Sequence, residues 1–392
     1  MSDDCEGNTL HIGVDASNIR AGGGVTHLSQ LLNAADPRSA GVHRVTVWAA
    51  PETLDALPTR PWLAARSPAW TNAPLPLRAL GQQWTLPREL RAEGCDVLFS
   101  PGGTLPRRCP IPVVTMSQNM LPFAPGEARR FGRGSAMHLK MLLLRIAQSY
   151  SFRNAEGLIF LTRYAKSAVT AALGDLQGAI AMIPHGVEQR FFQAPRVARE
   201  LAEFSLERPF RLLYVSTVTP YKHQIEVARA VSQLRSEGLP IEIRFAGALW
   251  GRYGETVRKE CLRLDPKGEF LHLIGVAQFA QLHTVYREAD AFLFASSCEN
   301  LPNILIEAMA AGLPIVSSSC GPMSEVLDDA AVYCDPESVH SIASAVRALT
   351  KDAVRRDVIA RTARQRAMAY SWERCAKDTF AFIAHVARSR GR

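Results

Sequence analysis

Several features that would assign a protein to a common class are missing from this sequence. Its eight cysteines are scattered and form no Cys-x-x-Cys pair, so neither a zinc site nor a disulfide scaffold is supported. No stretch reaches the ~18 to 20 apolar residues that a membrane-spanning helix needs. No apolar core with a positive flank stands near the start, so we expect no secretory signal and a cytoplasmic protein with reduced thiols.

Two catalytic motifs are missing as well. No Asp-x-Asp occurs, so the usual carboxylate bridge to a divalent metal is absent, and we expect metal-independent chemistry without a cofactor. The glycine-rich turn Gly22–Gly24 lacks the third glycine of a dinucleotide-binding fingerprint, because His27 stands at that position. This difference disfavours a dehydrogenase.

The residues that are present have the composition of a soluble globular protein, with 47% hydrophobic and 21% charged residues. A chain of 392 residues exceeds one ordinary core and predicts two domains. The net charge of +8 suits an anionic partner. Nucleic acid, acidic lipids and nucleoside diphosphates all meet this condition, and the charge alone does not choose among them.

Short apolar strands alternate with helical patterns along both halves of the chain. In the first half the expected strands are 10–14, 42–50, 97–100, 112–116, 157–162 and 182–187. After an irregular, polar linker at about 190–208, the expected strands are 211–216, 241–248, 271–274, 291–295 and 314–318. The alternation predicts two doubly wound parallel sheets, with ligands bound at the carboxyl ends of the strands.

The most informative stretch is residues 296–314, which follows the buried strand expected at 291–295. Pro302 and Asn303 are typical of a helix start, and Gly312 is typical of a helix end. The unpaired amides at such a helix start form an anion site.

Two carboxylates flank this anion site. Glu299 lies on the loop before the helix, and Glu307 lies about one turn inside it. Each can accept hydrogen bonds from hydroxyl groups. A phosphate site with an acid on either side indicates a nucleotide sugar as the ligand.

Residues 299–307 resemble the Glu-x7-Glu signature of retaining glycosyltransferases, most closely family 4 of the GT-B fold. The second half of the chain also matches this family at 214–216, Lys222, Gly275, 289–290 and 321–325. The first half matches more loosely, at 22–24, 158–162 and 183–187. The resemblance implies an acceptor domain at 1–190, a nucleotide-sugar domain at 205–371, and a final helix at about 372–392 that packs back on the first domain.

The resemblance also assigns roles to single residues. Lys222 would stabilise the charge that builds on the departing diphosphate. Family members usually carry an arginine a few residues earlier, where this chain has Thr217. Either the site is short of one positive charge, or another arginine supplies it.

The remaining donor site is also implied by resemblance. Glu307 would accept hydrogen bonds from the ribose hydroxyls, and Glu299, with Lys222 a catalytic candidate, would hold the donor sugar. Other candidates for donor binding are Gly23, Gly24, Thr217, Val276 and the backbone amides of Asn300, Leu301, Asn303 and Ile304.

Two residues are candidates for contact with the acceptor or the sugar. Many family members have a histidine near Gln118 and Asn119, and one of these amides would replace it by hydrogen bonding. A loop-stabilising role for Asn119 explains its presence equally well. We expect His185 to be a packed hinge residue rather than a catalyst.

The segment 127–153 is strongly basic and carries apolar residues among its cations. The basic residues are Arg129, Arg130, Arg133, Lys140, Arg145 and Arg153, against the single acid Glu127. Such a surface can rest on anionic lipid, where each well-placed cation adds about 1 kcal/mol. A solvated helix that packs on the core is the alternative.

These observations predict a retaining, metal-independent glycosyltransferase that moves a sugar from a nucleoside-diphosphate donor to a hydroxyl acceptor. Resemblance to O-antigen mannosyltransferases suggests a GDP-linked donor and a lipid-linked envelope polysaccharide as acceptor, which would bring the protein to the inner face of the cell membrane. Two alternatives stay open, a nucleotide-sugar epimerase on the same fold and a basic nucleic-acid-binding protein. The second lacks any known binding motif.

Overall fold

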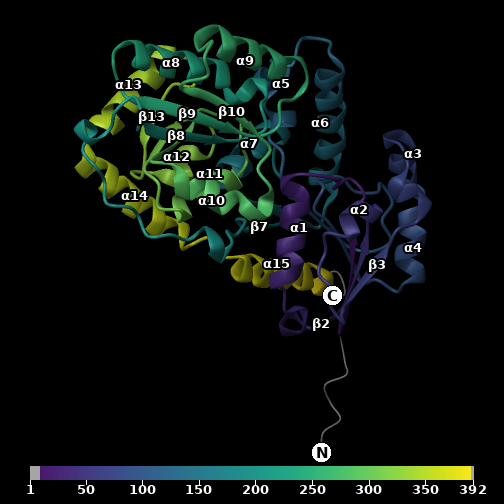
Figure 1. Ribbon diagram of the computed structural model, residues 1–392. Coiled ribbons are helices and arrows are strands. Elements are labelled where there is room, and N and C mark those ends of the chain that lie inside the picture. Colours follow the sequence, from purple (N-terminus) through teal and green to yellow (C-terminus); the bar gives the residue numbers. More distant parts are fainter. Residues whose placement is uncertain (1–8, 390–392) are drawn as a thin grey trace, which may run out of the picture. The chain divides into compact units, whose positions relative to one another are not determined.

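The computed structural model describes residues 9–389, which divide into two compact units (Figure 1). The first unit comprises the chain up to Phe123, Leu139–Gly186 and the chain from Ser371 onward. The second comprises Ala124–His138 and Val187–Tyr370. Sequence analysis places residues 124–138 with the first domain, whereas their contacts place them in the second unit.

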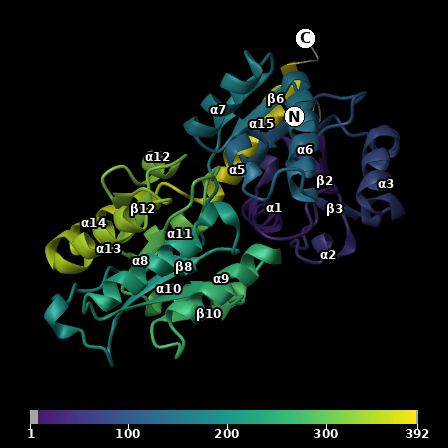
Figure 2. The same ribbon diagram turned by 90° about the horizontal axis from the view of Figure 1, so that it is seen from above.

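The first unit is built on a seven-stranded parallel sheet with the strand order β3-β2-β1-β4-β5-β6-β7. Its strands are β1 (Leu10–Asp15), β2 (Val42–Trp48), β3 (Leu63–Arg66), β4 (Val97–Ser100), β5 (Val113–Ser117), β6 (Gly157–Phe160) and β7 (Ala179–Met182). Its helices are α1 (Gly23–Ala34), α2 (Pro51–Leu54), α3 (Leu75–Leu80), α4 (Leu86–Ala92), α6 (Ala136–Asn154, whose first residues group with the second unit), α7 (Arg163–Leu173) and α15 (Trp372–Ser389). Helix α15 contacts α1, β4 and β6, and Figure 2 shows it beside β6.

The second unit is built on a six-stranded parallel sheet with the order β10-β9-β8-β11-β12-β13. Its strands are β8 (Phe210–Val215), β9 (Ile241–Ala246), β10 (Leu271–Gly275), β11 (Ala291–Phe294), β12 (Ile315–Ser318) and β13 (Val332–Cys334). Its helices are α5 (Pro125–Arg129), α8 (Gln224–Ser236), α9 (Gly251–Leu264), α10 (Leu282–Glu288), α11 (Asn303–Ala310), α12 (Met323–Leu327), α13 (Val339–Lys351) and α14 (Ala353–Ala367). Helices α8, α9 and α13 cover one face of the sheet, and α10, α11 and α14 cover the other (Figure 1).

The central strands are continuous apolar runs because helices bury both of their faces. Every residue of β1, β4, β5 and β11 is buried. The expected doubly wound α/β architecture is confirmed for both halves of the chain.

The strand expected over 182–187 is wrong. The edge strand β7 covers Ala179–Met182 instead, and each of its residues is only partly buried or exposed. Ile183 still donates its N–H to the carbonyl of Phe160 at 2.9 Å. The chain leaves the sheet at Pro184, which has no N–H to donate to a neighbouring strand.

A close backbone contact fixes the chain just after β7. A Cβ atom on Gly186 would lie 2.2 Å from the backbone nitrogen of Trp372, the first residue of α15. The Trp372 ring is buried and stacks on His185, with ring centroids 5.8 Å apart. Only glycine permits this approach, which ties the start of α15 to the exit from β7.

We expect Gly186→Ala to destabilise the protein by about 1 to 3 kcal/mol, because the added methyl group must displace backbone atoms of α15. Gly126→Ala is the matched control, since its Cβ would meet nothing within 4 Å. It lies in a short helix, so the change should be neutral or slightly stabilising. Thermal unfolding of both variants measures the difference, and equal midpoints would refute the close contact.

Candidate functional site

The strand order of the second unit creates a crevice between β8 and β11. The order reverses there, so the connections from β8 and β11 leave the sheet in opposite directions. All strands are parallel, and their carboxyl ends therefore lie at one edge. Lys222 follows β8, and Glu299 follows β11, so the two candidate catalytic residues come from the two sides of this crevice.

The structure brings Lys222 and Glu299 into direct contact. Lys222 Nζ donates to Glu299 Oε1, and the two side chains are only 9% and 13% exposed. Ser296 Oγ donates to the same carboxylate oxygen at 2.5 Å, and the Lys222 ammonium lies 4.8 Å from the ring centroid of Phe294. Because removal from water is costly for each charge, neither is stable here without a partner of opposite sign.

The two loops that carry this pair are bound to each other. The backbone N–H of Ser297 donates to the carbonyl of Tyr221 at 2.9 Å, and Tyr214 Oη donates to the carbonyl of Lys222 at 2.7 Å. His223 has φ 52°, a left-handed conformation that is costly for a residue with a Cβ. Its Nε2 lies 2.9 Å from Ser297 Oγ. The position of Lys222 is therefore fixed from both sides.

Helix α11 begins beside Glu299, as the sequence predicts. Pro302 occupies its N-cap position, and its own side chain makes no capping hydrogen bond. The amides of Asn303 and Ile304 are among the helix donors that have no intrahelical acceptor. Asn300 and Leu301 are buried in the loop before the helix. The helix start thus supplies donors next to the ion pair.

Glu307 lies one turn further along α11 and is buried. Tyr286 Oη donates to Glu307 Oε2 at 2.9 Å. Burial raises the pKa of the Glu307 carboxyl to about 7, although the bond from Tyr286 and the charge of Arg190 oppose the rise. This carboxyl group therefore changes its charge near neutral pH.

Two other predicted donor residues lie further from the ion pair. Thr217 is exposed just after β8. Val276 is 72% exposed and follows β10, which is two strands away from β8 and hence about 10 Å across the sheet. Both residues lie at the carboxyl edge of the sheet, but neither is recorded in contact with Lys222 or Glu299 among the described residues.

Sequence reasoning missed a contribution from residues 124–138. Ser297 Oγ donates to Glu127 Oε2 at 2.6 Å. The Phe131 ring packs against Tyr221 and, edge-on, against Trp250, with centroids 6.1 and 5.7 Å apart. This segment therefore contacts both loops that hold the ion pair. These contacts could not be predicted from the sequence, because Glu127 and Phe131 are single residues that belong to no motif.

Arg130, one of the cations predicted to face anionic lipid, has acidic partners within the second unit. Its guanidinium pairs with Glu127 at 2.7 Å and with Glu337. These two carboxylates neutralise the charge that the lipid was expected to attract. Arg129 and Arg133 are exposed.

The first unit has its own strand reversal, between β1 and β4. The turn before α1 follows β1, with Gly22 at φ 65°, so the amides of Gly23 and Gly24 lie at the helix start. Gln118, which follows β5, places its Nε2 3.1 Å from Nδ1 of His27. A Cβ on Gly24 would lie 3.8 Å from Gln118 Oε1. The structure thus brings the glycine-rich turn and Gln118 together.

The structure separates the roles of two other first-unit residues. The Asn119 side-chain oxygen accepts a hydrogen bond from the backbone N–H of Leu121 at 3.0 Å, which stabilises the loop. His185 is buried and stacks on His27, with ring centroids 4.4 Å apart. Burial holds the pKa of His27 well below its usual value, so this ring is neutral.

Asp15 is a further residue that the sequence did not single out. It ends β1 and is buried. Its carboxylate accepts a hydrogen bond from the backbone N–H of Ser17 at 3.0 Å and another from Gln82. Gln82 belongs to the π-helical turn Gly81–Thr85, a feature found often at functional sites. Burial raises the pKa of Asp15.

Among residues 9–389, no group of three or more histidine, cysteine, aspartate or glutamate side chains is placed to hold a metal ion. Within the same residues, no helix combines the length and the apolar character needed to cross a membrane.

The pKa of Glu307 predicts how stability depends on pH. The folded protein binds a proton at this site up to about pH 7, whereas the unfolded chain releases it near 4.5. The free energy of unfolding should therefore fall as pH rises between these values, by about 3 kcal/mol at most. Glu307→Gln keeps an acceptor for Tyr286 and should lack this fall. Thermal midpoints from pH 5 to 8 test this, with exposed Glu269→Gln as control, and identical profiles for all three proteins would contradict it.

Comparison with known proteins places these features in a family. The chain is similar to O-antigen chain mannosyltransferase B of Escherichia coli, with 25% identity over 169 residues, or 43% of this chain and 44% of the relative. The chain spans about half the length of the curated relatives it matches.

Two solved structures share the fold over nearly the whole chain. Sucrose-phosphate synthase from Thermosynechococcus elongatus has a TM-score of 0.73 at 16% identity and covers 97% of this chain and 99% of its own. WaaG, described as a glycosyltransferase involved in lipopolysaccharide biosynthesis, has a TM-score of 0.70 at 15% identity, with 95% and 99% covered.

Two family models account for most of the sequence. Residues 21–191 match the model of glycosyltransferase family 4, and residues 199–366 match that of glycosyl transferases group 1. The first match covers the glycine-rich turn and Gln118, and the second covers Lys222, Glu299 and Glu307. The chain therefore belongs to the GT-B glycosyltransferases of these two paired families.

Proposed function

We propose that this protein transfers a sugar from a nucleoside-diphosphate donor to a hydroxyl group of a saccharide acceptor. The observation that carries the proposal is the Lys222–Glu299 pair at the crevice between β8 and β11, beside the start of α11. A cation, a helix start and two carboxylates within one loop-helix segment match the charges and hydroxyl groups of a nucleotide sugar.

The ion pair suggests how the donor would bind. Lys222 and Glu299 neutralise each other in the protein without ligand. A diphosphate carries more negative charge than one carboxylate and competes for the Lys222 ammonium. Glu299 then loses its partner and becomes available to accept hydrogen bonds from sugar hydroxyls. Donor binding would thus replace the Lys222–Glu299 ion pair by two interactions, one between Lys222 and the diphosphate and one between Glu299 and the sugar hydroxyls.

Lys222 would then act on the transition state. Breaking the bond between the anomeric carbon and the phosphate oxygen leaves negative charge on the diphosphate, and a cation near that oxygen is favoured more as the charge grows. We further propose substitution from the same face of the sugar, with retention. The acceptor oxygen forms the new bond on that face, and its proton passes to the departing phosphate. Lys222 and the amides of α11 would carry the diphosphate charge without a metal ion.

Glu307 would bind the ribose of the donor. Its carboxyl has a pKa of about 7 in the unliganded protein, and hydroxyl donors favour its charged form. Nucleotide binding should therefore release protons near pH 6 to 7 and strengthen as the pH rises through this range.

The acceptor and the donor sugar are proposed from similarity. The relative in Escherichia coli is described as an O-antigen chain mannosyltransferase, and WaaG is described as acting in lipopolysaccharide biosynthesis. These names support an envelope saccharide as acceptor and mannose, or a related sugar from a GDP-linked donor, as the group transferred.

A lipid-linked acceptor would require contact with a membrane surface, and α6 supports such a contact. Its large apolar side chains with exposures from 44% to 66% are Leu139, Leu142, Leu143 and Ile146. The spacing i, i+3, i+4, i+7 puts them on one helix face. Exposed Lys140 adjoins this stripe. We propose that the stripe enters the lipid interface while exposed cations of 127–153 contact anionic headgroups, giving a peripheral protein at the inner face of the membrane.

A nucleotide-binding panel tests the proposed function. Thermal shift is measured with UDP, GDP, ADP, dTDP and CDP, with their sugar conjugates, and with NAD as control. A ligand that binds only the folded protein raises stability by ~2.7 kcal/mol at a hundredfold excess over its Kd. We expect a selective shift with one diphosphate and then sugar transfer from its conjugate. No shift with any of them would refute the proposal, and sugar turnover without an acceptor product would favour the epimerase.

Variants assign the response to the site. Lys222→Ala should lower the transfer rate at least about tenfold, because the diphosphate loses its cation. Glu307→Gln should weaken nucleotide binding and abolish the proton release measured by calorimetry in buffers of different ionisation enthalpy. Lys259→Ala, an exposed lysine on α9, is the matched control and should change neither quantity.

The membrane contact has its own test. Leu142→Ser, Leu143→Ser and Ile146→Ser together should reduce sedimentation with vesicles of phosphatidylcholine and phosphatidylglycerol, because less apolar surface enters the interface. Leu262→Ser with Val354→Ser replaces equally exposed residues elsewhere and serves as control. Binding that is unchanged by the α6 variant, or absent in the wild type, would refute the contact.

A further inference from the structure

A second cavity lies at the opposite edge of the second unit's sheet. Its volume is about 590 Å³, within the range of small-molecule sites. Its lining includes Phe210 at the start of β8, Asp290 just before β11 and Pro314 just before β12. These are the amino ends of the strands, whereas Lys222 and Glu299 follow the carboxyl ends. The cavity is therefore separate from the proposed donor site.

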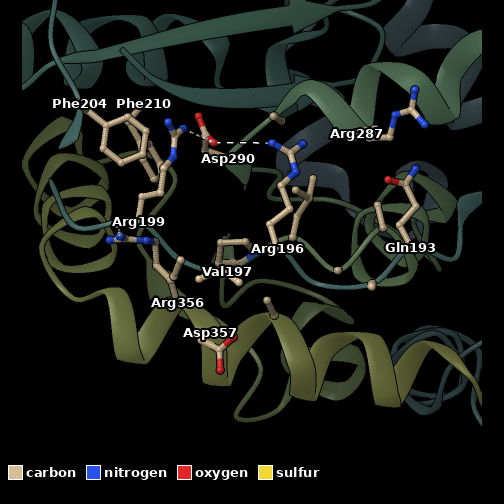
Figure 3. A pocket seen from close by; sticks show the side chains of 18 residues that line it. Gln193, Arg196, Val197, Arg199, Phe204, Phe210, Arg287, Asp290, Arg356 and Asp357 are labelled. Atoms are coloured by element: carbon tan, nitrogen blue, oxygen red, sulfur yellow. Dashed lines mark hydrogen bonds and ion pairs between the residues drawn. The ribbon is translucent and has the colours of Figure 1, made fainter. Parts of the chain in front are cut away.

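Arginines from three parts of the second unit line this cavity. They are Arg196 and Arg199 from the irregular chain before β8, Arg287 from α10 and Arg356 from α14 (Figure 3). The acids that line it are Asp290 and Asp357. Asp357 is already paired with Arg361, at 2.7 Å. The lining thus carries an excess of positive charge, and Asp290 is the one lining acid that is left to offset it.

Asp290 does not neutralise this charge. One of its oxygens accepts the backbone N–H of Arg211 at 3.0 Å. The other lies 3.3 Å from Arg199 and 3.8 Å from Arg196, and Figure 3 shows both guanidinium groups directed toward it. Burial lowers the pKa of Arg196, and the like charges of Arg199, Arg211 and Arg287 lower it further, although Asp290 opposes the change.

Two of the arginines have structural tasks. Arg356 is buried and donates to the carbonyls of Leu349, Thr350 and Arg199. Arg199 stacks over the Phe204 ring, with its Cζ 4.3 Å from the centroid. These contacts fix the wall of the cavity in place.

Arg196 and Arg287 have N–H groups that are available to a ligand. Arg196 is 49% exposed, and its contact with Asp290 exceeds hydrogen-bond distance. Arg287 is exposed, and it lines the cavity with its guanidinium directed away from Asp290 (Figure 3). Each guanidinium carries five N–H groups in a fork that matches phosphate oxygens.

We propose that this cavity binds a small phosphorylated molecule, whose phosphate group is held by Arg196 and Arg287. A phosphate dianion would relieve the repulsion among the arginines and form charge-assisted hydrogen bonds with both. The cavity is much larger than one phosphate ion, and Val197, Phe204 and Leu313 give it apolar walls. An organic phosphate with an apolar body therefore fits better than inorganic phosphate. The chain at 193–199 forms one wall, so the ligand would also brace this segment against the sheet.

Calorimetric titration with phenyl phosphate, and with inorganic phosphate for comparison, tests the site at constant ionic strength. We expect wild-type protein to bind phenyl phosphate more tightly than phosphate. Arg196→Gln with Arg287→Gln should weaken phenyl phosphate binding at least about tenfold, since the phosphate loses its charge-assisted hydrogen bonds to both guanidinium groups. Both side chains are partly or largely exposed, so the fold should persist, which thermal unfolding checks.

Two controls separate this site from its alternatives. Arg229→Gln with Arg258→Gln removes the same charge from the surface of α8 and α9, and should leave binding unchanged. Lys222→Ala should also leave it unchanged, while weakening binding of the nucleoside diphosphate. Binding that survives Arg196→Gln with Arg287→Gln, falls equally in the surface control, or is lost in Lys222→Ala would each overturn the proposal. The last result would assign the phosphate to the donor site and leave the proposed function intact.

Discussion

Parallel strands are the constraint on which the organisation of this protein depends. Both sheets are parallel throughout, so every carboxyl end in a sheet reaches the same edge and every amino end reaches the other. The order reverses once in each sheet. The loops diverge at these points, and the candidate functional residues lie there. They are Lys222 and Glu299 in the second unit and the glycine-rich turn in the first. The arginine-lined cavity lies at the other edge of the second sheet, where the amino ends of the strands meet.

Electrostatics divides the proposed donor site into two parts that would respond differently to a ligand. Lys222 and Glu299 are charged and satisfied by each other, so a ligand must compete for them. Glu307 is held by burial near the midpoint of its titration at neutral pH, with Tyr286 as its hydrogen-bond donor. The first part favours an anion and the second favours hydroxyl groups. In the proposed function, the two parts together would distinguish a nucleotide sugar from a bare phosphate.

The segment 124–138 adds a physical link that conventional motif reading overlooks. Its contacts with Ser297 and Tyr221 reach both loops of the ion pair, and Arg130 joins two acids there. The basic composition of this stretch suggested a surface for lipid. Arg130 pairs with acids within the second unit, and it is exposed, as Arg129 and Arg133 are.

Sequence patterns predicted most strands because fully buried strands are uninterrupted apolar runs, as at Ala291–Phe294. They missed β3 and β13, since β3 is partly exposed and β13 has only three residues. The double-glutamate segment was predicted because residue type, spacing and helix signals coincide. Asp15 and Glu127 were not, because a lone acid has no signature and its partners come from distant parts of the chain. The assignments of Thr217 and Val276 to the donor stay predictions.

The path of the chain also bears on how the protein is made. The first unit needs α15, which follows residue 370, whereas the second unit takes most of its residues from one continuous stretch, Val187–Tyr370. During synthesis, β4 and β6 emerge long before α15, the helix that packs against both strands. The second unit can therefore complete its core on the ribosome while the first waits with apolar surface open to solvent. Such a delay lengthens the time during which the first unit exposes apolar surface that can aggregate.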